Sequence, residues 1–432
     1  MMQNSLFYDY YALIDSCSFL KKYDALFRAF DMVYDQPDFP EVGRHGYRRS
    51  AYFKALIYKR SANIKYISDL VRDLESRPIL AEMCGFNAGR IPDASRFSRF
   101  LTDTNNSEIE TLFHTSGKLL VEKGIATLDV IMADSKPIKA NTKHNNPKNP
   151  NRKLDKTTKI KRNPMATLSY YSYIKQPSGD QKKTFTWFWG YRTHVLLSGE
   201  GIPLIEVTLP NNRTDGKVAK ALLKKFVRVY GQKKGRIFLG DAGYDDRELY
   251  NFIVDKLKAE PFIPLNRRNQ QPDKTMGPHG LPLCPANLEM KFAGINREET
   301  RTRKKFRCPI AGGTKQEKAS LPQQCPINHD LFCTGKCYGC TAYIDITDDH
   351  RSQVPRESKR FKDTYKCRTE AERYFSRLGP REVEEMSQYK YRAIRNQMTI
   401  AHLTLSLTAV AAALVLEQPD KIRCYKTFAD AA

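Results

Sequence analysis

The segment FKDTYKCRTEAERYFSRLG, residues 361–379, constrains the fold most strongly, because its spacing predicts a helix with an acid on its apolar face. At about 100° per residue, Tyr365, Arg368 and Glu372 fall on one arc of this helix, and the flanking phenylalanines predict that the arc faces the core. Glu370 falls on the opposite side, which is expected to be solvated. Burying an ionised carboxylate is costly unless it is paired, so Glu372 needs a cation.

Two kinds of cation fit Glu372. Arg368 lies one helical turn earlier, and this spacing is typical of a structural ion pair. A metal ion is the alternative, and it needs further carboxylates from elsewhere in the chain.

Two aspartates upstream follow short apolar, strand-like runs. Asp134 closes the alternating run of residues 128–132 before a Ser-Lys-Pro sequence that is expected to stop the strand, and Asp241 directly follows residues 237–239. An aspartate at such a place points into a cleft, or is only a helix cap. Three acids in this order favour a site for two Mg²⁺ or Mn²⁺ ions, about 3.5 to 4 Å apart, held by Asp134, Asp241 and Glu372.

Three sequence blocks together resemble the signature blocks of DDE transposases from bacterial insertion sequences. They are ADSKPIKA around Asp134, GDAGYDD around Asp241, and the helix in which Tyr365, Arg368 and Glu372 have the spacing Y-x2-R-x3-E. The resemblance extends to GRHGYRRSAYFKALIY, IPDASRFSRF and GYRTHVLL, so it covers most of the chain.

The resemblance implies an α/β, ribonuclease-H-like catalytic domain that cuts DNA at the ends of an element and joins the freed 3′-hydroxyl to target DNA. In such a site Tyr365 and Arg368 position a DNA phosphate or the glutamate itself. Related transposases have a lysine seven residues beyond the glutamate, where this chain has Gly379. A basic side chain has a role there only if Arg377 or Arg381 substitutes for that lysine, whereas the acidic triad is intact.

The formal net charge of +24 predicts a polyanionic partner, and DNA fits it best. Because each neutralised phosphate releases counterions, binding should weaken steeply with salt. Basic composition alone would also suit a ribosome-like protein. Only the three candidate acids distinguish the two possibilities. The expected partners are the terminal inverted repeats of the element, its target DNA, and further copies of this chain assembled on DNA.

Residues 1–120 are expected to form a helical domain, because apolar residues recur at helical spacing between proline and glycine breaks. Basic residues are dense over residues 44–60 and in IPDASRFSRF, a capped helix that displays Arg96 and Arg99. The functional interpretation is a DNA-binding domain whose arginines reach phosphates or groove edges. The alternative is a helical cap, packed on the catalytic domain, whose charges are only solvated.

Residues 141–186 are expected to form a basic, flexible insert, because the segment begins with a run of Lys, Arg, Asn and Pro that has almost no large apolar side chains. Lys136, Lys139 and Lys143 are expected to contact the DNA backbone here, and a solvated insert without specificity is the alternative. The aromatic residues that follow either stack on unpaired bases or fill a strand core, which is the fate expected for the tryptophans. They are Tyr170, Tyr171, Tyr173, Trp187 and Trp189.

The remainder of residues 121–265 predicts a mixed sheet that forms the first part of the catalytic domain. Strand-like runs cover TWFWGYRTHVLL, IPLIEVTL, the segment before Asp241 and PFIPL, and a helix is expected to begin near Thr214 or Asp215. This order is consistent with a ribonuclease-H-like sheet. His194 and Asp215 lie near strand ends, where a structural role is favoured over a place in the active site.

Residues 266–360 are expected to be a cysteine-rich insertion between the second and third acids, as the resemblance also implies. Thiolates would bind Zn²⁺ and stabilise a small unit that lacks a core, although only one clean C-x2-C pair is present. Reduced free thiols are the alternative. The candidate zinc ligands are Cys308, Cys325, Cys333, Cys337 and Cys340.

Residues 361–432 are expected to complete the catalytic domain with the Glu372 helix and a C-terminal core helix. The apolar run MTIAHLTLSLTAVAAALVL is nearly long enough to span a membrane, but its His, Thr and Ser side chains favour a core helix. No secretory signal is evident at the start, so a bacterial cytoplasm, association with the nucleoid and no membrane partner are expected.

The sequence therefore predicts a DNA-strand-transferring enzyme that acts through positioning and charge neutralisation. Two other functions remain open. An endonuclease with the same triad would cut without joining, and a domesticated, catalytically silent protein would only bind DNA.

Overall fold

The computed structural model describes residues 12–39, 46–87, 89–175, 182–266, 275–299, 301–312, 321–322, 325–327, 339–347, 349–379 and 384–423. Residue contacts divide the chain into two units. The larger consists of Met1–Pro264 and Arg356–Ala432, and the smaller of Leu265–Pro355. Each unit has a sheet of its own.

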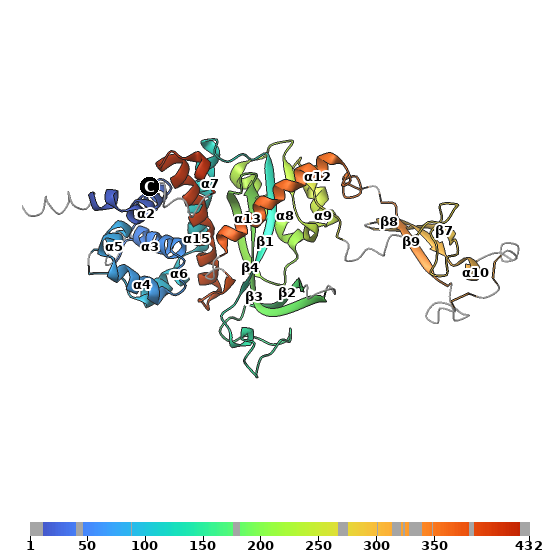
Figure 1. The fold of residues 1–432 in the computed structure, drawn as a ribbon, viewed down its shortest axis with the longest axis horizontal. Helices are drawn as coiled ribbons and strands as arrows, with labels where there is room; N and C mark the ends of the chain where they lie inside the picture. The colour runs from blue at the N-terminus through green and yellow to red at the C-terminus, as the bar shows by residue number, and fades with distance from the viewer. Residues whose placement is uncertain are drawn as a thin grey trace, which may run out of the picture. The chain divides into compact units, whose positions relative to one another are not determined.

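Helices precede the sheet in the larger unit, as the sequence predicts (Figure 1). They pack around buried aromatic rings, such as Tyr52, which stacks on Phe100 with the ring centroids 4.7 Å apart. The N-terminal helices share this core with the C-terminal apolar segment, because the same cluster of buried side chains includes Ala393, Leu403 and Leu407. The bounds are α2 Ser18–Asp31, α3 Arg49–Ser61, α4 Ile67–Ser76, α5 Pro78–Cys84, α6 Ala94–Asp103 and α7 Asn106–Glu122.

A mixed sheet forms the centre of the larger unit. Its long strand β3 pairs antiparallel with β1 on one side and β4 on the other, while β5 and β6 continue the sheet parallel to β1. Three antiparallel strands followed by two strands parallel to the first are the arrangement of a ribonuclease-H-like sheet, so the predicted fold class is confirmed. The bounds are β1 Val130–Lys139, β3 Lys182–Ser198, β4 Pro203–Pro210, β5 Ile237–Leu239 and β6 Glu260–Phe262.

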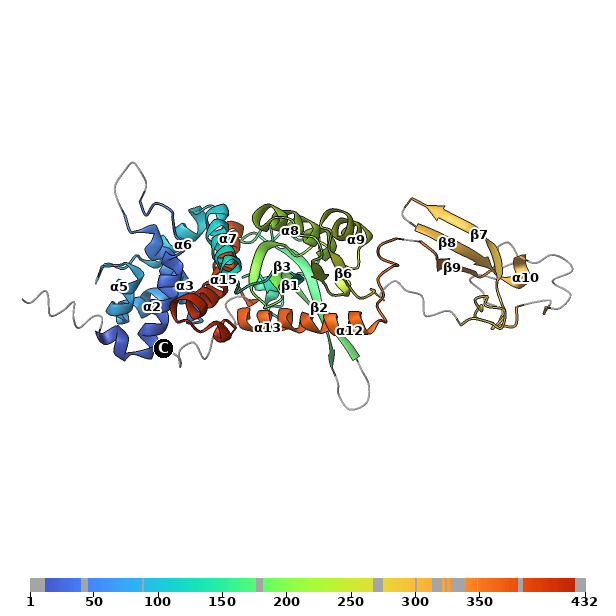
Figure 2. The same cartoon turned by 90° about the horizontal axis from the view of Figure 1, so that it is seen from above.

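Helices lie on both faces of this sheet (Figure 2). On one face are α8 (Asp215–Tyr230) and α9 (Arg247–Asn251), and on the other are α12 (Lys359–Tyr365) and α13 (Thr369–Leu378). Both α8 and α13 are amphipathic, and α13 packs its buried side against β1. The helix that carries the third acid therefore lies against the strand that carries the first.

Strand β1 is longer than the sequence predicts, since it continues past Asp134 through the Ser-Lys-Pro sequence to Lys139. The pairing of β1 with β5 ends at Met132, so from there to the bridge between Lys139 and Glu385 the strand pairs with β3 alone. A proline is tolerated on such an open side, where no ladder partner needs its missing N–H. The expectation that Pro137 stops the strand is wrong for this reason.

The basic insert is also more ordered than expected. Its second half forms β2 (Thr167–Lys175), which pairs with the outer part of β3. Its first half is held by asparagine side chains: Asn145 bonds to the backbone of Ala140 and Trp189, and Asn163 is fully buried. An amide side chain both donates and accepts, so it replaces a missing strand partner. The expectation of a flexible segment is therefore wrong for the described residues.

The aromatic residues of the insert have different environments. Trp189 is buried against Ile160 and Leu168, as expected of a strand-core residue. Trp187 is 38 % exposed and touches Tyr170, so the expectation of a core position is wrong for this tryptophan.

The apolar C-terminal run forms α15 (Tyr391–Val410), between the N-terminal helices and the sheet (Figure 1). Of the described residues, Tyr391–Val415 alone is long and apolar enough to cross a membrane, and 83 % of its apolar window is buried inside the protein. Its polar side chains have partners there, as in the bond between Ser406 and Ser116. A core helix accounts for these contacts.

The smaller unit contains a three-stranded antiparallel sheet of β7 (Lys291–Glu298), β8 (Arg301–Arg307) and β9 (Thr341–Asp345), with a short helix α10 (Pro309–Gly312). Its core is small and includes Cys284. Three of the cysteines expected to bind zinc lie in described segments, whereas two lie outside the described residues: these two are Cys333 and Cys337.

Candidate active site

The first two acids occupy equivalent positions on adjacent parallel strands. The last paired residues of β1 and β5 are Met132 and Leu239, and Asp134 and Asp241 each lie two residues beyond this pair. Because the strands are parallel and side chains alternate, both carboxylates leave the sheet at the same place and on the same side. The sequence placed both acids at strand ends, and the pairing register explains why they meet.

Both aspartates are held by backbone N–H groups. Asp134 accepts a hydrogen bond from the N–H of Ser135 at 2.8 Å, and Asp241 accepts one from the N–H of Gly243 at 2.7 Å. Asp241 thereby caps a short 3₁₀ turn and still directs its other oxygen to the site. The cap is therefore present, and it leaves the second oxygen of Asp241 facing Arg368.

The third acid is carried by a helix whose faces differ from the sequence expectation. Glu370 is buried, with 8 % of the residue exposed, while the side chain of Glu372 is 65 % exposed. The buried side of α13 is the stripe of Ala371, Tyr374, Phe375 and Leu378, and at about 100° per residue Glu370 falls beside this stripe while Glu372 falls outside it. A 3₁₀ turn at Lys366–Arg368 also separates α12 from α13, so the two helices do not share one helical wheel. The predicted core-facing position of Glu372 is therefore wrong.

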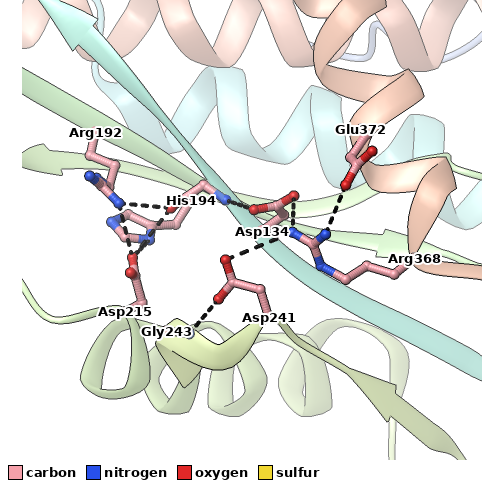
Figure 3. Close-up of polar contacts among 9 residues, drawn as sticks. Asp134, Arg192, His194, Asp215, Asp241, Gly243, Arg368 and Glu372 are labelled. Carbon is pink, nitrogen blue, oxygen red and sulfur yellow. Dashed lines mark hydrogen bonds and ion pairs between the residues drawn. The ribbon is translucent and has the colours of Figure 1, made fainter. Parts of the chain in front are cut away.

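The three acids converge on the guanidinium of Arg368 (Figure 3). Its Nη2 lies 3.2 Å from Asp134 Oδ2 and 3.8 Å from Asp241 Oδ2, and its Nη1 lies 3.0 Å from Glu372 Oε1. The Arg368 side chain is only 16 % exposed. The predicted pair of Arg368 with Glu372 is present, and the same cation also neutralises the other two acids.

Burial and charge act against each other in this cluster. Burial raises the pKa of Asp134 to about 6, while Arg368 and the bond from Ser135 oppose this rise. Burial lowers the pKa of Arg368, but the surrounding acids outweigh it and raise that pKa overall. The site is thus a concentration of negative charge that requires a resident cation.

A fourth carboxylate borders the cluster. Asp215, at the start of α8, accepts a hydrogen bond from Ser135 at 3.3 Å and lies 3.6 Å from Arg192 and 3.5 Å from His194 (Figure 3). Burial, together with the charge of Asp241, raises the pKa of Asp215 against the effect of Arg192. The sequence favoured a structural role for Asp215 and His194. A search for acids near strand ends, which found Asp134 and Asp241, also finds Asp215.

The donor set of the cluster fits a hard divalent cation. Three carboxylates from β1, the turn after β5 and α13 supply oxygen ligands, which Mg²⁺ and Mn²⁺ prefer. As the side chains stand, no group of three His, Cys, Asp or Glu residues within the described part of the chain surrounds a metal position. The guanidinium of Arg368 occupies the position between the three carboxylates, and its Nε is buried without a hydrogen-bond partner. A metal would therefore compete with a cation that is incompletely satisfied.

The other expected site residues fall into two places. Tyr365 is brought beside the triad, where its ring stacks on Phe361 with the centroids 5.7 Å apart. Arg96 and Arg99 lie on α6 among the N-terminal helices, and of the two possible caps, Asp93 and Ser95, it is Asp93 that caps the helix. Lys139 ends β1 and lies over the Tyr171 ring.

Two further expectations concern basic residues near the end of α13. Arg377 does not take the place of a lysine at position 379, because it donates to the carbonyl oxygen of Gly201 at 3.1 Å. Arg381 lies outside the described residues. Lys143 belongs to a 3₁₀ turn that opens the insert, and in the described part of the chain its side chain does not contact the triad.

Comparisons with known proteins identify the family. A family model described as a transposase DDE domain matches residues 126–407, and one described as a transposase domain matches residues 8–103. A search of curated proteins gives no match.

Solved structures with similarity to this chain are also transposases. The piggyBac transposase synaptic complex with hairpin DNA has 9 % identity and a TM-score of 0.37, covering 88 % of this chain and 69 % of that one. The Mos1 paired-end complex with the left transposon end has 16 % identity and a TM-score of 0.17, covering 54 % and 64 %.

The Mos1 strand transfer complex has 16 % identity and a TM-score of 0.17, covering 51 % of this chain and 60 % of that one. These values are low. The DDE-domain model, in contrast, spans more than half of the chain and includes all three acids that meet at Arg368. The chain therefore belongs to the family of transposases with a DDE catalytic domain.

Proposed function

We propose that this protein cuts DNA at the ends of a mobile element in a metal-dependent reaction and joins the freed 3′-hydroxyl to target DNA. The observation that carries the proposal is the convergence of Asp134, Asp241 and Glu372 on one cation at the edge of a ribonuclease-H-like sheet. Transposases of the DDE family use divalent metals such as Mg²⁺, and this acidic cluster has the oxygen donors for them.

We propose two Mg²⁺ or Mn²⁺ ions, held by the same three acids. Bound there, such ions activate the attacking water or hydroxyl and stabilise the leaving oxygen. The protein's contribution is to fix the carboxylates: β1 and the N–H of Ser135 hold Asp134, and the N–H of Gly243 holds Asp241. Glu372 is the most exposed of the three, and its side chain is accessible to solvent.

Arg368 and Tyr365 are proposed to hold the phosphate at the site. Arg368 is the cation nearest the acids, and a guanidinium pairs with phosphate oxygens through two parallel hydrogen bonds. Tyr365 lies one turn earlier and is half-buried, so its position is fixed by packing. Both residues are thus poised at the boundary between the acids and solvent.

More remote contacts to the terminal repeats are proposed for Arg96 and Arg99 of α6 and for Lys139 and Lys143 at the start of the insert. The arginines project from a helix that is anchored by buried Phe97, as needed for a contact to phosphates or groove edges. Synapsis of two element ends by copies of this chain is part of the proposal.

A zinc site in the smaller unit is a separate proposal. The N–H of Cys308 donates to the carbonyl oxygen of Cys340 at 2.8 Å, so two of the expected ligands lie on adjoining backbone. Such a site would stabilise a unit whose core is small. Metal analysis of purified protein tests it, with about one zinc per chain as the supporting result and none as the contrary one.

Cleavage of DNA that contains the element's own ends tests the main proposal. We expect Mg²⁺-dependent nicking at those ends, and loss of at least a thousandfold in Asp134→Asn, Asp241→Asn and Glu372→Gln with DNA binding retained. The control is Asp363→Asn, an exposed acid on α12 that pairs only with neighbouring Lys366 in the described structure. Binding without any metal-dependent cleavage would instead support a silent DNA-binding protein.

Joining distinguishes a transposase from an endonuclease with the same triad. A pre-cut donor with a free 3′-hydroxyl is incubated with target plasmid and Mg²⁺. Covalent joining of the donor strand to the target supports the proposal, whereas cleavage without joining supports the endonuclease.

A further inference from the structure

The space beside Gly379 is filled by a side chain from a distant strand. A Cβ atom built on Gly379 would lie 2.7 Å from Nζ of Lys136. No real Cβ has so close a neighbour, so any other residue at position 379 would displace that ammonium. The ammonium of Lys136 on β1 therefore occupies the space that a side chain at position 379 would take.

The side chain of Lys136 binds the C-terminal end of α13. Its ammonium donates to the carbonyl oxygen of Phe375 at 3.4 Å and lies 3.0 Å from a carboxylate oxygen of Glu384. The last carbonyls of a helix lack partners within it and carry partial negative charge, so an ammonium is stabilised there. Only 18 % of the Lys136 side chain is exposed.

Asp134 and Lys136 lie on the same face of β1, because they are two residues apart in a strand. Asp134 pairs with Arg368, the residue immediately before α13, while Lys136 binds the last turn of that helix. One strand thus holds both ends of α13, and Glu372 lies between these two attachments.

We propose that Lys136 is a positioning residue that fixes the Glu372 helix against the strand of Asp134, and that position 379 is glycine to admit its ammonium. The effect on catalysis rests on the proposed function above, because positioning matters only if Asp134 and Glu372 share metal ions. The attachment of α13 to β1 stands independently of that function.

The sequence analysis expected Lys136 to contact DNA. The two roles predict different measurements, since a phosphate contact sets DNA affinity and its salt dependence, whereas a positioning contact sets how well the acids hold a metal. The partly buried ammonium and its protein partners favour positioning.

The test compares Lys136→Met, Lys136→Arg and the matched control Lys139→Met on the same strand. For Lys136→Met we expect the Mg²⁺ concentration at half-maximal cleavage, measured at saturating DNA, to rise roughly tenfold. DNA affinity and its salt dependence should stay unchanged. Lys136→Arg should restore most of the loss, because a guanidinium also donates to helix carbonyls. Lys139→Met should show the opposite pattern, with weaker DNA binding and an unchanged Mg²⁺ midpoint.

Hydrogen exchange supplies a readout that needs neither DNA nor metal. In Lys136→Met the amides of residues 369–378 should exchange faster than in the wild type, and in Lys139→Met they should not. If wild-type protein shows no metal-dependent cleavage, the proposed function fails and this exchange alone decides the positioning claim. Unchanged exchange and an unchanged Mg²⁺ midpoint, with weaker DNA binding, would overturn the claim in favour of a DNA contact.

Gly379→Ala tests the second half of the proposal. We expect it to reproduce the Lys136→Met defect, and the double variant to be no worse than either single one, because both changes remove the same contact. The new Cβ would also lie 2.6 Å from the carbonyl oxygen of Phe375. Losses that add in the double variant would show that Gly379 acts through this backbone contact alone, and would overturn the link to Lys136.

Discussion

The carboxylate of Asp134 and the guanidinium of Arg368 form an ion pair, Oδ2 to Nη2 3.2 Å, between residues 234 positions apart in the chain. The same guanidinium contacts Asp241 and Glu372, so a protein cation stands where the acids would share metal ions. Arg368 therefore stabilises the acidic cluster when metal is absent and competes with metal when it is present.

Replacing Arg368 with glutamine should increase the stabilisation of the DNA-free protein by Mg²⁺. The reason is that three neighbouring carboxylates lose their resident cation. A tenfold tighter Mg²⁺ affinity corresponds to about 1.4 kcal/mol, or an extra rise in melting temperature of roughly 2 to 4 °C. The measurement is thermal unfolding with and without Mg²⁺.

The control for this prediction is Arg373→Gln on the neighbouring helix α13, where the guanidinium pairs with Glu370 instead. An Mg²⁺ shift of the same size in Arg368→Gln, Arg373→Gln and the wild type would contradict the competition between Arg368 and metal.

Gly243→Ala should reduce cleavage on the order of 10- to 100-fold while DNA binding is retained. A Cβ at this position would lie 2.8 Å from Asp241 Oδ1 and 3.2 Å from Asp215 Oδ2, so it would push both carboxylates from their places. The measurement is the single-turnover cleavage rate at saturating DNA and Mg²⁺. Gly46→Ala, where a Cβ meets nothing within 4 Å, is the matched control. Equal rates for the two variants would count against this effect.

Neutralising both arginines of α6 should weaken the salt dependence of DNA binding. If Arg96 and Arg99 each contact one phosphate, their replacement by glutamine lowers the slope of log K against log salt by roughly 2. The measurement is a binding titration at several salt concentrations. A variant with the same change in charge, Arg28→Gln with Arg72→Gln, removes exposed arginines of α2 and α4 and should leave the slope near that of the wild type. Equal losses in both variants would indicate a general charge effect.

Glu206 should make the stability of the larger unit depend on pH. This glutamate is 2 % exposed between β4 and α15, and burial raises its pKa from 4.5 to about 7 although a bond from Thr399 opposes the rise. The folded protein therefore binds this proton more tightly than the unfolded chain does. The stabilisation is fully present below pH 4.5 and is lost as the pH rises through about 7.

Glu206→Gln removes this titration. Relative to the variant, the wild type should lose on the order of 3 kcal/mol of unfolding free energy between pH 4.5 and pH 8. Denaturant unfolding of both proteins at several pH values measures the difference, from which the other titrating groups cancel. A difference that does not change with pH would contradict the ionisation of Glu206 in this range.

Local sequence was sufficient to locate β5 and the first two acids. Ile237–Leu239 is bounded by a charged residue and a glycine, and the structure gives β5 the same limits. Because Asp134 and Asp241 follow apolar runs that pair in register, strand ends alone indicated that they meet. These features depend on neighbouring residues and on the alternation of apolar and polar side chains, and both can be seen directly in a sequence.

One error had a local cause. Glu370 is buried instead of Glu372 because the apolar stripe of α13 is Ala371, Tyr374, Phe375 and Leu378, and a single helical wheel drawn through the 3₁₀ turn missed this stripe. The other errors concern features that need a three-dimensional partner. The contact between Lys136 and α13 joins residues 239 positions apart. The order of the insert depends on buried asparagine side chains such as Asn163, whose residue type is also common in unstructured segments.

The end of α13 receives one more side chain, and it comes from the N-terminal helices. Arg60 of α3 is 7 % exposed and donates to the carbonyl oxygen of Leu378 at 2.7 Å. Removing the N-terminal helices would expose the last turn of the Glu372 helix and the apolar side of α15 as well. The part of the chain proposed to recognise element ends is therefore not an exchangeable module. Grafting another recognition domain onto this catalytic core would require a replacement for Arg60, so specificity for DNA ends and the integrity of the cutting site must change together.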